Sequence, residues 1–480
     1  MINRMNAPKS IVYITRDVER AVGLLGEHTP SRSAGHPSGG GDLLVVTNVS
    51  PLAEAMAQKY GKQVITVPRS RDRSRPVPTV DLLQNDFVQE KIQELSQDKK
   101  PHILVFKTSP QIESECERLG WKLLNPPYEA GTVLEEKIIQ WRWLQTIVGA
   151  YCNTPLRAEW QLPQTWTGQL KIRSYKELLS DLGSQPIVQF NRGHTGLGTF
   201  RFESEKQWEE LQKKFPKREV KVSRWYEGEA YTVNAIVVRN NELGMRNQVG
   251  ATGRSPVRIG SISKQLTGIP GCTDNPYATV GNDWSEGAKL PDEMKNKICS
   301  CARTIGSTLG ERGYRGMFGI DVIATSEGRV VLIEINPRQP ASATMESQLQ
   351  KERGEGSMME WHVRALLGNE ELGITNNVPK SVNGFQLFFR NVENHPVRLK
   401  DEFTPGRYKI SEQGIEFVEK AISVVEIQKG EVFAFSVSKN ETVKPGGELL
   451  RIQAKNDMIH TLGDNCEKTI RAIHRQIELA

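Results

Sequence analysis

The chain has 480 residues, of which 37% are hydrophobic and 25% are charged, which is enough for two or three domains with a sizeable core. Its net charge of +6 is small for this length, which argues against an obligate nucleic-acid partner but leaves an anionic small substrate compatible. The cysteines show no zinc spacing, and no secretory segment or 18-residue apolar run occurs. We therefore expect a cytoplasmic protein with reduced thiols and no membrane partner.

The N-terminal part of the chain alternates strand-like and helical patterns. Strand-like runs occur at 43–49, at "QVITVP" and at "HILVFK", and helical patterns occur at 51–60 and near 110–118. This alternation is typical of a parallel sheet with helices on its faces, and we predict an N-terminal α/β domain at 1–128. The charged segment "RSRDRSRP" at 69–76 is compatible with phosphate or RNA binding, although a solvated loop is the favoured interpretation.

A glycine-rich loop joins two strand-like runs in "PIVQFNRGHTGLGTF", residues 186–200. Glycines let the backbone bend sharply and direct N–H groups at a phosphate, and two basic side chains could add charge. The residues concerned are Arg192, Gly193, His194, Gly196 and Gly198. A plain hairpin loop explains the same pattern, and neither a P-loop nor a dinucleotide fold is supported, because no GK[ST] and no helix follows.

Two more strands, "EVKVSRWY" and "AYTVNAIVV", precede a stretch at 243–290 that we expect to be irregular. Long loops in compact enzymes are usually functional or mobile. Arg246, Arg254 and Arg258 in this stretch suit an anionic substrate, although loop arginines are more often simply solvated. We predict that these three arginines lie on the substrate side of a cleft.

The stretch "GIDVIATSEGRVVLIEINPR", residues 319–338, predicts a hairpin closed by a two-residue turn at Glu327 and Gly328. That turn places Asp321 opposite Glu334, and alternation places Val330, Leu332, Glu334 and Asn336 on one face. Both faces are largely apolar, and burying two opposed carboxylates unpaired costs roughly several kcal/mol. A divalent cation held by Asp321, Glu334 and Asn336 would remove this conflict. The alternative is an exposed hairpin whose acids point into water.

From about Gly384 the pattern changes to short strands and turns, followed by a terminal helix with Ile470, Ile473 and Ile477 on one stripe. We predict a small β-rich domain at 381–480. Its segment "VKPGGELLRI" resembles a turn of biotinyl and lipoyl carriers, but no lysine occupies the carrier position.

The order of these features resembles the ATP-grasp ligases. The resemblance covers about residues 120–345: a helix with Glu136-Lys137, a strand and glycine loop, "SRWYEGEAYTVNAIVV", and Asp321 followed by "EINPR". It implies an ATP-grasp domain at 129–380 made of two α+β subdomains, with a lid subdomain at about 150–225. The expected fold class is therefore mixed α/β and α+β, with the N-terminal α/β domain before the ATP-grasp fold and the β-rich domain after it.

The resemblance also implies which residues bind ATP and its metal. Asp321, Glu334 and Asn336 would hold Mg²⁺, or Mn²⁺ in its place, on the ATP phosphates. The implied ATP contacts are Lys137, Gln189, Arg192, Gly193, His194, Gly196, Gly198, Arg224, Trp225, Tyr226 and Glu229. Two positions depart from the family pattern: Gln189 stands where the family usually has lysine, and Ser223 or Arg224 stands where it usually has glutamate. Lys137, Arg192 and His194 are candidates to supply the missing charge.

The implied reaction is attack of a substrate carboxylate on the γ-phosphorus of ATP, followed by displacement of phosphate from the acyl phosphate by an amine. Asn336 and Arg338 would be catalytic, and the Arg338 guanidinium fork would hold the carboxylate or the acyl phosphate. A surface ion pair is the alternative for Arg338. We expect an ADP-forming carbon–nitrogen ligase acting on small molecules, with a homodimer as the default assembly. A biotin-carboxylase-like acyl-phosphate former, a nucleotide-binding protein without turnover and, most distantly, an RNA-binding module are the alternatives.

Overall fold

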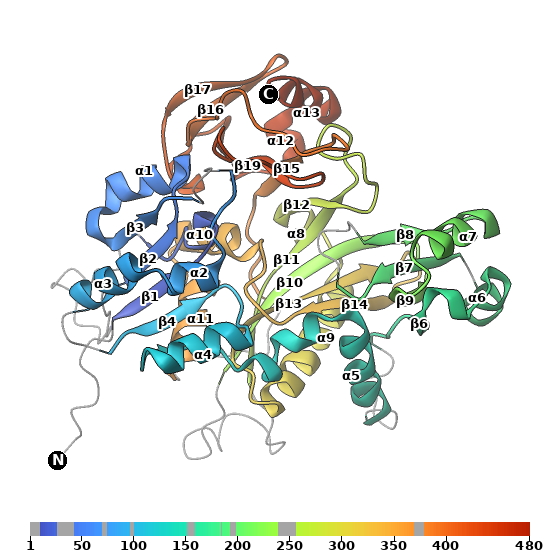
Figure 1. Cartoon of the computed structure of the whole chain (residues 1–480). Helices are drawn as coiled ribbons and strands as arrows, with labels where there is room; N and C mark the ends of the chain where they lie inside the picture. Colours follow the sequence, from blue (N-terminus) through green and yellow to red (C-terminus); the bar gives the residue numbers. More distant parts are fainter. Residues whose placement is uncertain are drawn as a thin grey trace. The chain divides into compact units, whose positions relative to one another are not determined.

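The computed structural model describes residues 10–25, 43–69, 74–96, 100–150, 159–183, 185–192, 198–238, 256–368 and 379–480. The chain divides into two compact units (Figure 1). Unit 1 contains residues 1–128, 341–372 and 383–480, and unit 2 contains 129–340 and 373–382. The N-terminal and C-terminal parts of the chain therefore belong to one unit, and the three domains predicted from the sequence stay a prediction.

The N-terminal part of unit 1 is a parallel sheet in the order β3-β2-β1-β4-β5. Its strands are β1 Ile11–Ile14, β2 Leu43–Asn48, β3 Val64–Val67, β4 His102–Val105 and β5 Lys122–Leu123. Its helices are α1 Pro51–Tyr60, α2 Thr79–Leu83, α3 Asp86–Leu95 and α4 Pro110–Arg118. Helices α1 and α4 begin in the same way, with a serine side chain that accepts a backbone N–H and a proline in the first turn. This part of the fold agrees with the alternation read from the sequence.

The C-terminal part of unit 1 is an antiparallel sheet in the order β15-β19-β18-β16-β17. Its strands are β15 Phe385–Arg390, β16 Gly406–Ser411, β17 Gly414–Lys420, β18 Glu431–Ser436 and β19 Glu448–Ala454. The helices of this part are α10 Ala343–Glu352, α11 Met358–Leu367, α12 Met458–Leu462 and α13 Cys466–Arg475. Ile470 and Ile473 on α13 are buried as predicted, while Ile477 is buried beyond the end of the helix.

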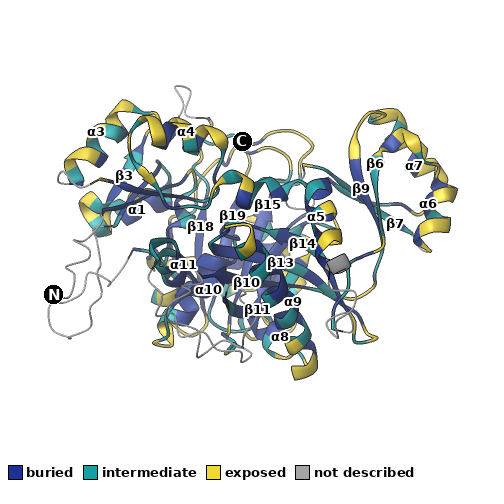
Figure 2. Ribbon diagram, turned by 90° about the horizontal axis from the view of Figure 1, so that it is seen from below, coloured by how far each residue is buried: buried dark blue, intermediate teal, exposed yellow. Residues whose placement is uncertain are grey.

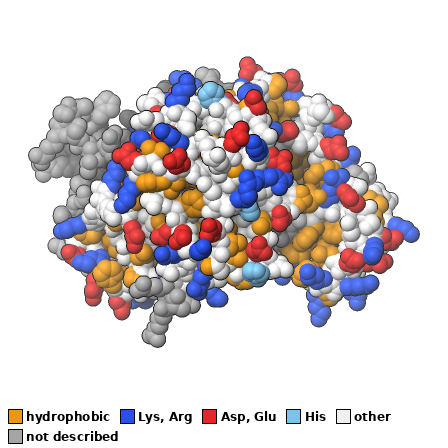
Figure 3. Space-filling view, turned by 90° about the horizontal axis from the view of Figure 1, so that it is seen from above, with side chains coloured by type: hydrophobic (Ala, Val, Ile, Leu, Met, Phe, Trp, Pro, Cys, Tyr) orange, Lys and Arg blue, Asp and Glu red, His pale blue; other side chains and the backbone are white. Residues whose placement is uncertain are grey.

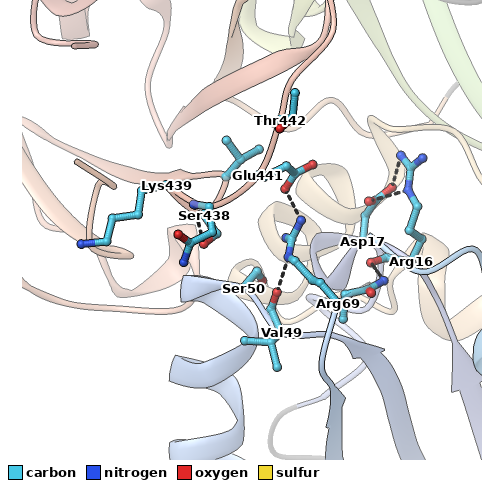
Figure 4. A network of polar contacts seen from close by, with 12 residues as sticks. Arg16, Asp17, Val49, Ser50, Arg69, Ser438, Lys439, Glu441 and Thr442 are labelled. Carbon is cyan, nitrogen blue, oxygen red and sulfur yellow. Dashed lines mark hydrogen bonds and ion pairs between the residues drawn. The ribbon is translucent and has the colours of Figure 1, made fainter. Parts of the chain in front are cut away.

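The segment predicted to be a solvated loop begins with a buried side chain. Arg69 is only 8% exposed; it donates to the Val49 carbonyl at 2.8 Å and pairs with Glu441 at 2.5 Å (Figure 4). The backbone N–H of Thr442 also donates to the carbonyl of Ser74 at 2.9 Å. For Arg69 the prediction of a solvated side chain is wrong, because an acidic residue far away in the sequence supplies its partner.

His362 on α11 gives unit 1 a pH dependence that can be measured. Burial lowers the pKa of His362 from 6.5 to about 4, so the unfolded chain binds more protons between these values. Its contribution to stability is therefore complete above pH 6.5 and is lost as the pH falls towards 4. Through this group the wild type should lose about 2 kcal/mol of unfolding free energy between pH 7 and pH 5, and His362→Gln should not show this loss. The measurement is urea unfolding at the two pH values, in which the midpoint of the variant should fall less than that of the wild type.

The matched control is His395→Gln, which alters an exposed histidine of the same unit. It should leave the pH slope of the urea midpoint unchanged. Equal slopes for wild type and His362→Gln would show that His362 does not stay neutral in the folded protein.

Unit 2 is built on an antiparallel sheet in the order β14-β13-β10-β11-β12. Its strands are β10 Glu229–Val237, β11 Val257–Thr267, β12 Thr279–Asp283, β13 Gly316–Ala324 and β14 Val330–Asn336. The helices are α5 Lys137–Ala150, α8 Trp284–Ala288 and α9 Asp292–Glu311. Buried residues of α9, such as Ile298 and Ile305, pack on the strands in one core, and Figure 2 shows the central strands largely buried.

The expectation of an irregular stretch at 243–290 is wrong for 257–267 and 279–288 and agrees with the structure at 268–278. Strands β11 and β12 and helix α8 lie within it. The apolar residues of "VRIGSISKQL" do not keep a strand's alternation, and its glycine and serines give it the composition of a loop.

The second sheet of unit 2 has the order β6-β9-β7-β8 and is here called the lid sheet. Its strands are β6 Thr165–Gln169, β7 Pro186–Phe190, β8 Thr199–Arg201 and β9 Glu219–Arg224, with helices α6 Tyr175–Leu182 and α7 Glu205–Lys214. Val188 and Val222 from the strands form a core with Leu178 of α6 and Trp208 of α7. Because side chains alternate along a strand, the neighbours Gln189 and Lys221 project from the opposite face.

Two surface properties bear on partners. None of the described helices is long and apolar enough to cross a membrane. Figure 3 shows acidic and basic side chains interspersed over the face that it draws, in keeping with the small net charge.

Candidate functional site

The hairpin of β13 and β14 places the two predicted carboxylates opposite each other. Asp321 pairs with Glu334 and Gly319 with Asn336, as the sequence predicts. The predicted two-residue turn is wrong, because Thr325 and Arg329 bond through their backbones and Gly328, at φ 75°, donates to the Thr325 carbonyl. The loop therefore has three residues and ends in the left-handed conformation that glycine adopts most easily.

A β-bulge at Ile333 compensates for the longer turn. The register shifts between Asp321 and Val322, so Ile333 is the extra residue of β14. Val330, Leu332 and Ile335 consequently belong to one apolar core, and the predicted sharing of a face by Leu332 and Glu334 is wrong. The bulge restores the pairing of Asp321 with Glu334 that the incorrect turn had predicted.

Asp321 is partly buried and lies among hydrogen-bond donors. Its Oδ1 accepts from Thr232 Oγ1 and from Gln265 Nε2, both at 2.6 Å, and its Oδ2 accepts from Asn336 Nδ2 at 2.9 Å. Burial, and after it the charge of Glu334, raises the pKa of Asp321 above its usual range. The site thus holds a carboxylate whose ionised form is disfavoured until more positive charge is near.

Glu334 forms an ion pair with Lys137, whose side chain is 5% exposed. No cluster of three or more His, Cys, Asp and Glu side chains fit to hold a metal ion occurs in the described part of the chain, and the predicted set has two carboxylates and an amide. These oxygen ligands are the type that Mg²⁺ prefers when water and phosphate complete its octahedron. The pairing of Asp321 with Glu334 across the hairpin, with the Asn336 amide on Asp321, is the observation by which the donor set fits a divalent cation.

Arg338 lies beside the proposed metal ligands, and its guanidinium already has protein partners. Its Nε pairs with Glu135, its Nη2 donates to Asn336 Oδ1 at 3.1 Å and its Nη1 donates to the Gln339 carbonyl at 3.3 Å. The side chain is 16% exposed, so it is not a solvated surface arginine. Arg338 can fix the Asn336 amide, and it would have to exchange partners to grip a substrate carboxylate.

The start of α5 is capped by a residue at the end of β7. The Asn191 carbonyl accepts from the Lys137 N–H, and the Asn191 Oδ1 accepts from the Ile138 N–H, both at 3.0 Å. Asn191 also donates to Glu136, which pairs with the exposed Arg192. Lys137 is thereby fixed next to the entry of the glycine loop.

Most of the predicted glycine loop lies outside the described residues, namely Gly193, His194 and Gly196. Gly198 is described at the far side of the loop, where a Cβ would lie 3.3 Å from the Phe190 side chain. Arg192, one of the candidates to supply the missing lysine charge, has a side chain that is 76% exposed and pairs with Glu136. It therefore faces solvent rather than an enclosed site.

The predicted adenine hinge follows β9. The N–H groups of Arg224 and Trp225 donate to the carbonyls of Gln164 and Gln185, at 2.8 and 3.2 Å. Adenine contacts at this hinge would therefore rest on the Tyr226 N–H and on carbonyl oxygens. Glu229, the predicted ribose contact, opens β10 and pairs with Lys264 at 2.5 Å while 57% exposed.

Only one of the three predicted substrate arginines lies among the described residues. Arg246 and Arg254 lie outside the described residues. Arg258 is partly buried on β11, opposite Ile236, rather than on a loop.

Comparison with known proteins gives this arrangement a family. Residues 174–342 match the family model described as an ATP-grasp domain. The chain contains an ATP-grasp domain. The matched residues include the lid strands β7 and β9 and the hairpin with Asp321, Glu334 and Asn336, while Lys137 precedes them.

Solved structures with a similar fold span almost the whole chain. An N5-carboxyaminoimidazole ribonucleotide synthetase in complex with ADP is 13% identical, with a TM-score of 0.54, and covers 99% of this chain and 100% of its own. An L-amino acid ligase from Bacillus licheniformis is 12% identical, with a TM-score of 0.54 and 98% coverage of both chains. Biotin carboxylase from Campylobacter jejuni is 12% identical, with a TM-score of 0.56, covering 93% of this chain and 88% of its own. No curated protein sequence matches. At these identities the structures establish a shared fold, which agrees with the fold class expected from the sequence.

The open edge of β14 is satisfied by residues that the sequence did not single out. Gln140 of α5 accepts from the Ile335 N–H at 3.0 Å and donates to the Ile335 carbonyl at 2.6 Å. Gln161 pairs with this edge through its backbone: its N–H donates to the Val330 carbonyl and its carbonyl accepts from the Leu332 N–H, both at 2.9 Å. Lys221 donates to the carbonyl of the bulged Ile333 at 3.1 Å. These contacts fix the strand that carries Glu334 and Asn336.

Proposed function

We propose that the chain is an ATP-dependent ligase that activates a carboxylate as an acyl phosphate and joins it to an amine, releasing ADP and phosphate. The observation that carries the proposal is the pairing of Asp321 with Glu334 inside a matched ATP-grasp domain, with Asn336 two residues further on. Two of the similar structures are an L-amino acid ligase and an ADP complex of a synthetase, which supports this class of reaction.

Each residue of the proposed site has a distinct task. Asp321, Glu334 and Asn336 would hold Mg²⁺, which when bound neutralises charge on the ATP phosphates. Lys137 lies next to Glu334 and would bind a phosphate oxygen. Arg338 would orient the carboxylate or hold the acyl phosphate, with Asn336 as its neighbour. Positioning and electrostatics would then do most of the work, so no nucleophilic side chain is required.

Gln189 favours a second candidate function, nucleotide binding without turnover. It occupies the strand position before the glycine loop and brings no charge to the phosphates. We also propose small-molecule partners, a cytoplasmic location and a homodimer, none of which depends on this choice.

The test is a pairwise screen of amino acids with ATP and Mg²⁺, read out as ADP and phosphate release. We expect ADP formation to require both a carboxylate and an amine, because an acyl phosphate is consumed only when its acceptor is present. A parallel reaction with bicarbonate in place of the amino-acid carboxylate tests a biotin-carboxylase-like route. Binding of ATP without ADP release in every reaction would contradict the ligase and support the nucleotide-binding function.

A further inference from the structure

Lys221 is a buried lysine on β9 that is not among the ATP contacts implied by the resemblance to the family. It lies directly opposite Gln189 in the antiparallel pair β7–β9. Directly opposed residues share one face of a sheet, with Cβ atoms about 5 Å apart. The ammonium of Lys221 thus starts from the same face as the position where the family usually has its lysine, but from the neighbouring strand.

The Lys221 ammonium lacks a counter-ion among the described residues. The residue is 3% exposed, and the Ile333 carbonyl at 3.1 Å is its one hydrogen-bond partner in the described part of the chain, while the Trp141 ring lies 5.9 Å from the ammonium. An ammonium has three N–H donors, so two are left without a described acceptor. Lys137, the nearest cation, has taken Glu334 as its own ion-pair partner.

The surroundings make this arrangement unfavourable unless an anion binds. Burial and the repulsion from Lys137 lower the pKa of Lys221 to about 8, although Glu334 opposes this effect. A buried ammonium without a counter-ion normally destabilises a protein. Two lysines that converge beside one carboxylate are suited to the several negative charges of a nucleoside triphosphate.

We propose that Lys221 binds a phosphate oxygen of ATP and supplies the positive charge that Gln189 lacks. The inference rests on the proposed ATP binding and deepens it, because it reduces the force of Gln189 as an argument against turnover. A purely structural role is the competing explanation, in which Lys221 only links β9 to the bulge of β14.

The register suggests a test in which the charge is moved rather than only removed. Lys221→Gln should weaken binding of a non-hydrolysable ATP analogue with Mg²⁺ by about 10- to 100-fold, the range for losing a hydrogen bond to a charged group. The double variant Gln189→Lys/Lys221→Gln returns one ammonium to the same face from β7. We expect it to restore the affinity to within about 3-fold of wild type, because the two positions are directly opposed.

The measurement is calorimetric titration of the full chain, with Lys217→Gln as the matched control. Lys217 is an exposed lysine of the same subdomain, so its loss should leave the affinity unchanged. Unchanged affinity in Lys221→Gln overturns the inference. Reduced affinity that the double variant does not restore also overturns it, in favour of the structural link. If wild type itself does not bind the analogue, the proposed function fails first, and that result is distinct from either of the others.

Discussion

Asp321→Asn is expected to lower Mg²⁺-dependent ADP formation by roughly 10²- to 10³-fold, with the largest loss at low Mg²⁺. The amide that replaces the carboxylate carries no charge for a cation. It keeps the size of the side chain, and its oxygen can still accept from Thr232 and Gln265, while the hydrogen bond from Asn336 is lost because two amide NH2 groups then face each other. Glu334→Gln should have an effect of similar size, because the two acids face each other across the hairpin. The measurement is ADP release as a function of Mg²⁺ concentration.

The same substitution should stabilise the protein while it lowers activity. A stability measurement therefore shows whether the activity is lost because a metal ligand is missing or because the protein unfolds. Burial and Glu334 disfavour ionised Asp321, so the folded protein binds its proton more readily than the unfolded chain does. Stability from this group is therefore lost as the pH rises through its pKa. Without added metal, Asp321→Asn should raise the free energy of unfolding at pH 7 by about 1 kcal/mol or more.

Glu327→Gln is the control for both measurements. Glu327 is an exposed acid in the loop of the same hairpin, paired only with Arg329 among the described residues. It should change neither ADP formation nor stability measurably. Full activity in Asp321→Asn at every Mg²⁺ concentration, including the lowest that supports the wild type, would show that the carboxylate is not a metal ligand.

The hairpin could be predicted from the sequence because its information is local. Asp321 and Glu334 are separated by one turn, so a pattern of apolar residues is enough to pair them. The turn itself was predicted one residue too short, and Ile333 was not recognised as a bulge. These two errors cancel at the site, because the extra residue in β14 offsets the extra residue in the loop. A bulge has no composition signal when its residue is as apolar as its neighbours.

The partners of the site could not be predicted because they come from distant parts of the chain. Asn191 caps α5 from the end of β7, far away in the sequence. Lys221 could not be identified because the family pattern concerns one strand position, Gln189, and the sequence does not state which residue of β9 lies opposite it. Gln265 was assigned to an irregular stretch that turned out to contain β11. In each case the missing information is the register between elements far apart in sequence.

Arg338→Met is expected to lower kcat/KM by roughly 10²-fold, the second large effect at this site. In the structure the guanidinium joins Glu135 to Asn336, so it can act on the substrate or through a metal ligand. Arg338→Lys distinguishes these roles, because lysine keeps the charge but loses the fork. If Arg338 grips the substrate, Arg338→Lys should raise the KM for the carboxylate about 10-fold and leave the half-saturating Mg²⁺ concentration unchanged.

The opposite pattern would contradict direct contact with substrate. An Arg338→Lys variant whose Mg²⁺ requirement rises while its KM for the carboxylate stays constant would make Arg338 a positioning residue for Asn336. Arg329→Met is the matched control, since that arginine lies in the hairpin loop and is 46% exposed. Glu135→Gln adds a second comparison, because it removes the ion pair of the Arg338 Nε. If Arg338 binds the substrate, this variant should have a lower KM for the carboxylate. If Arg338 positions Asn336, the variant should instead show the same rise in Mg²⁺ requirement as Arg338→Lys.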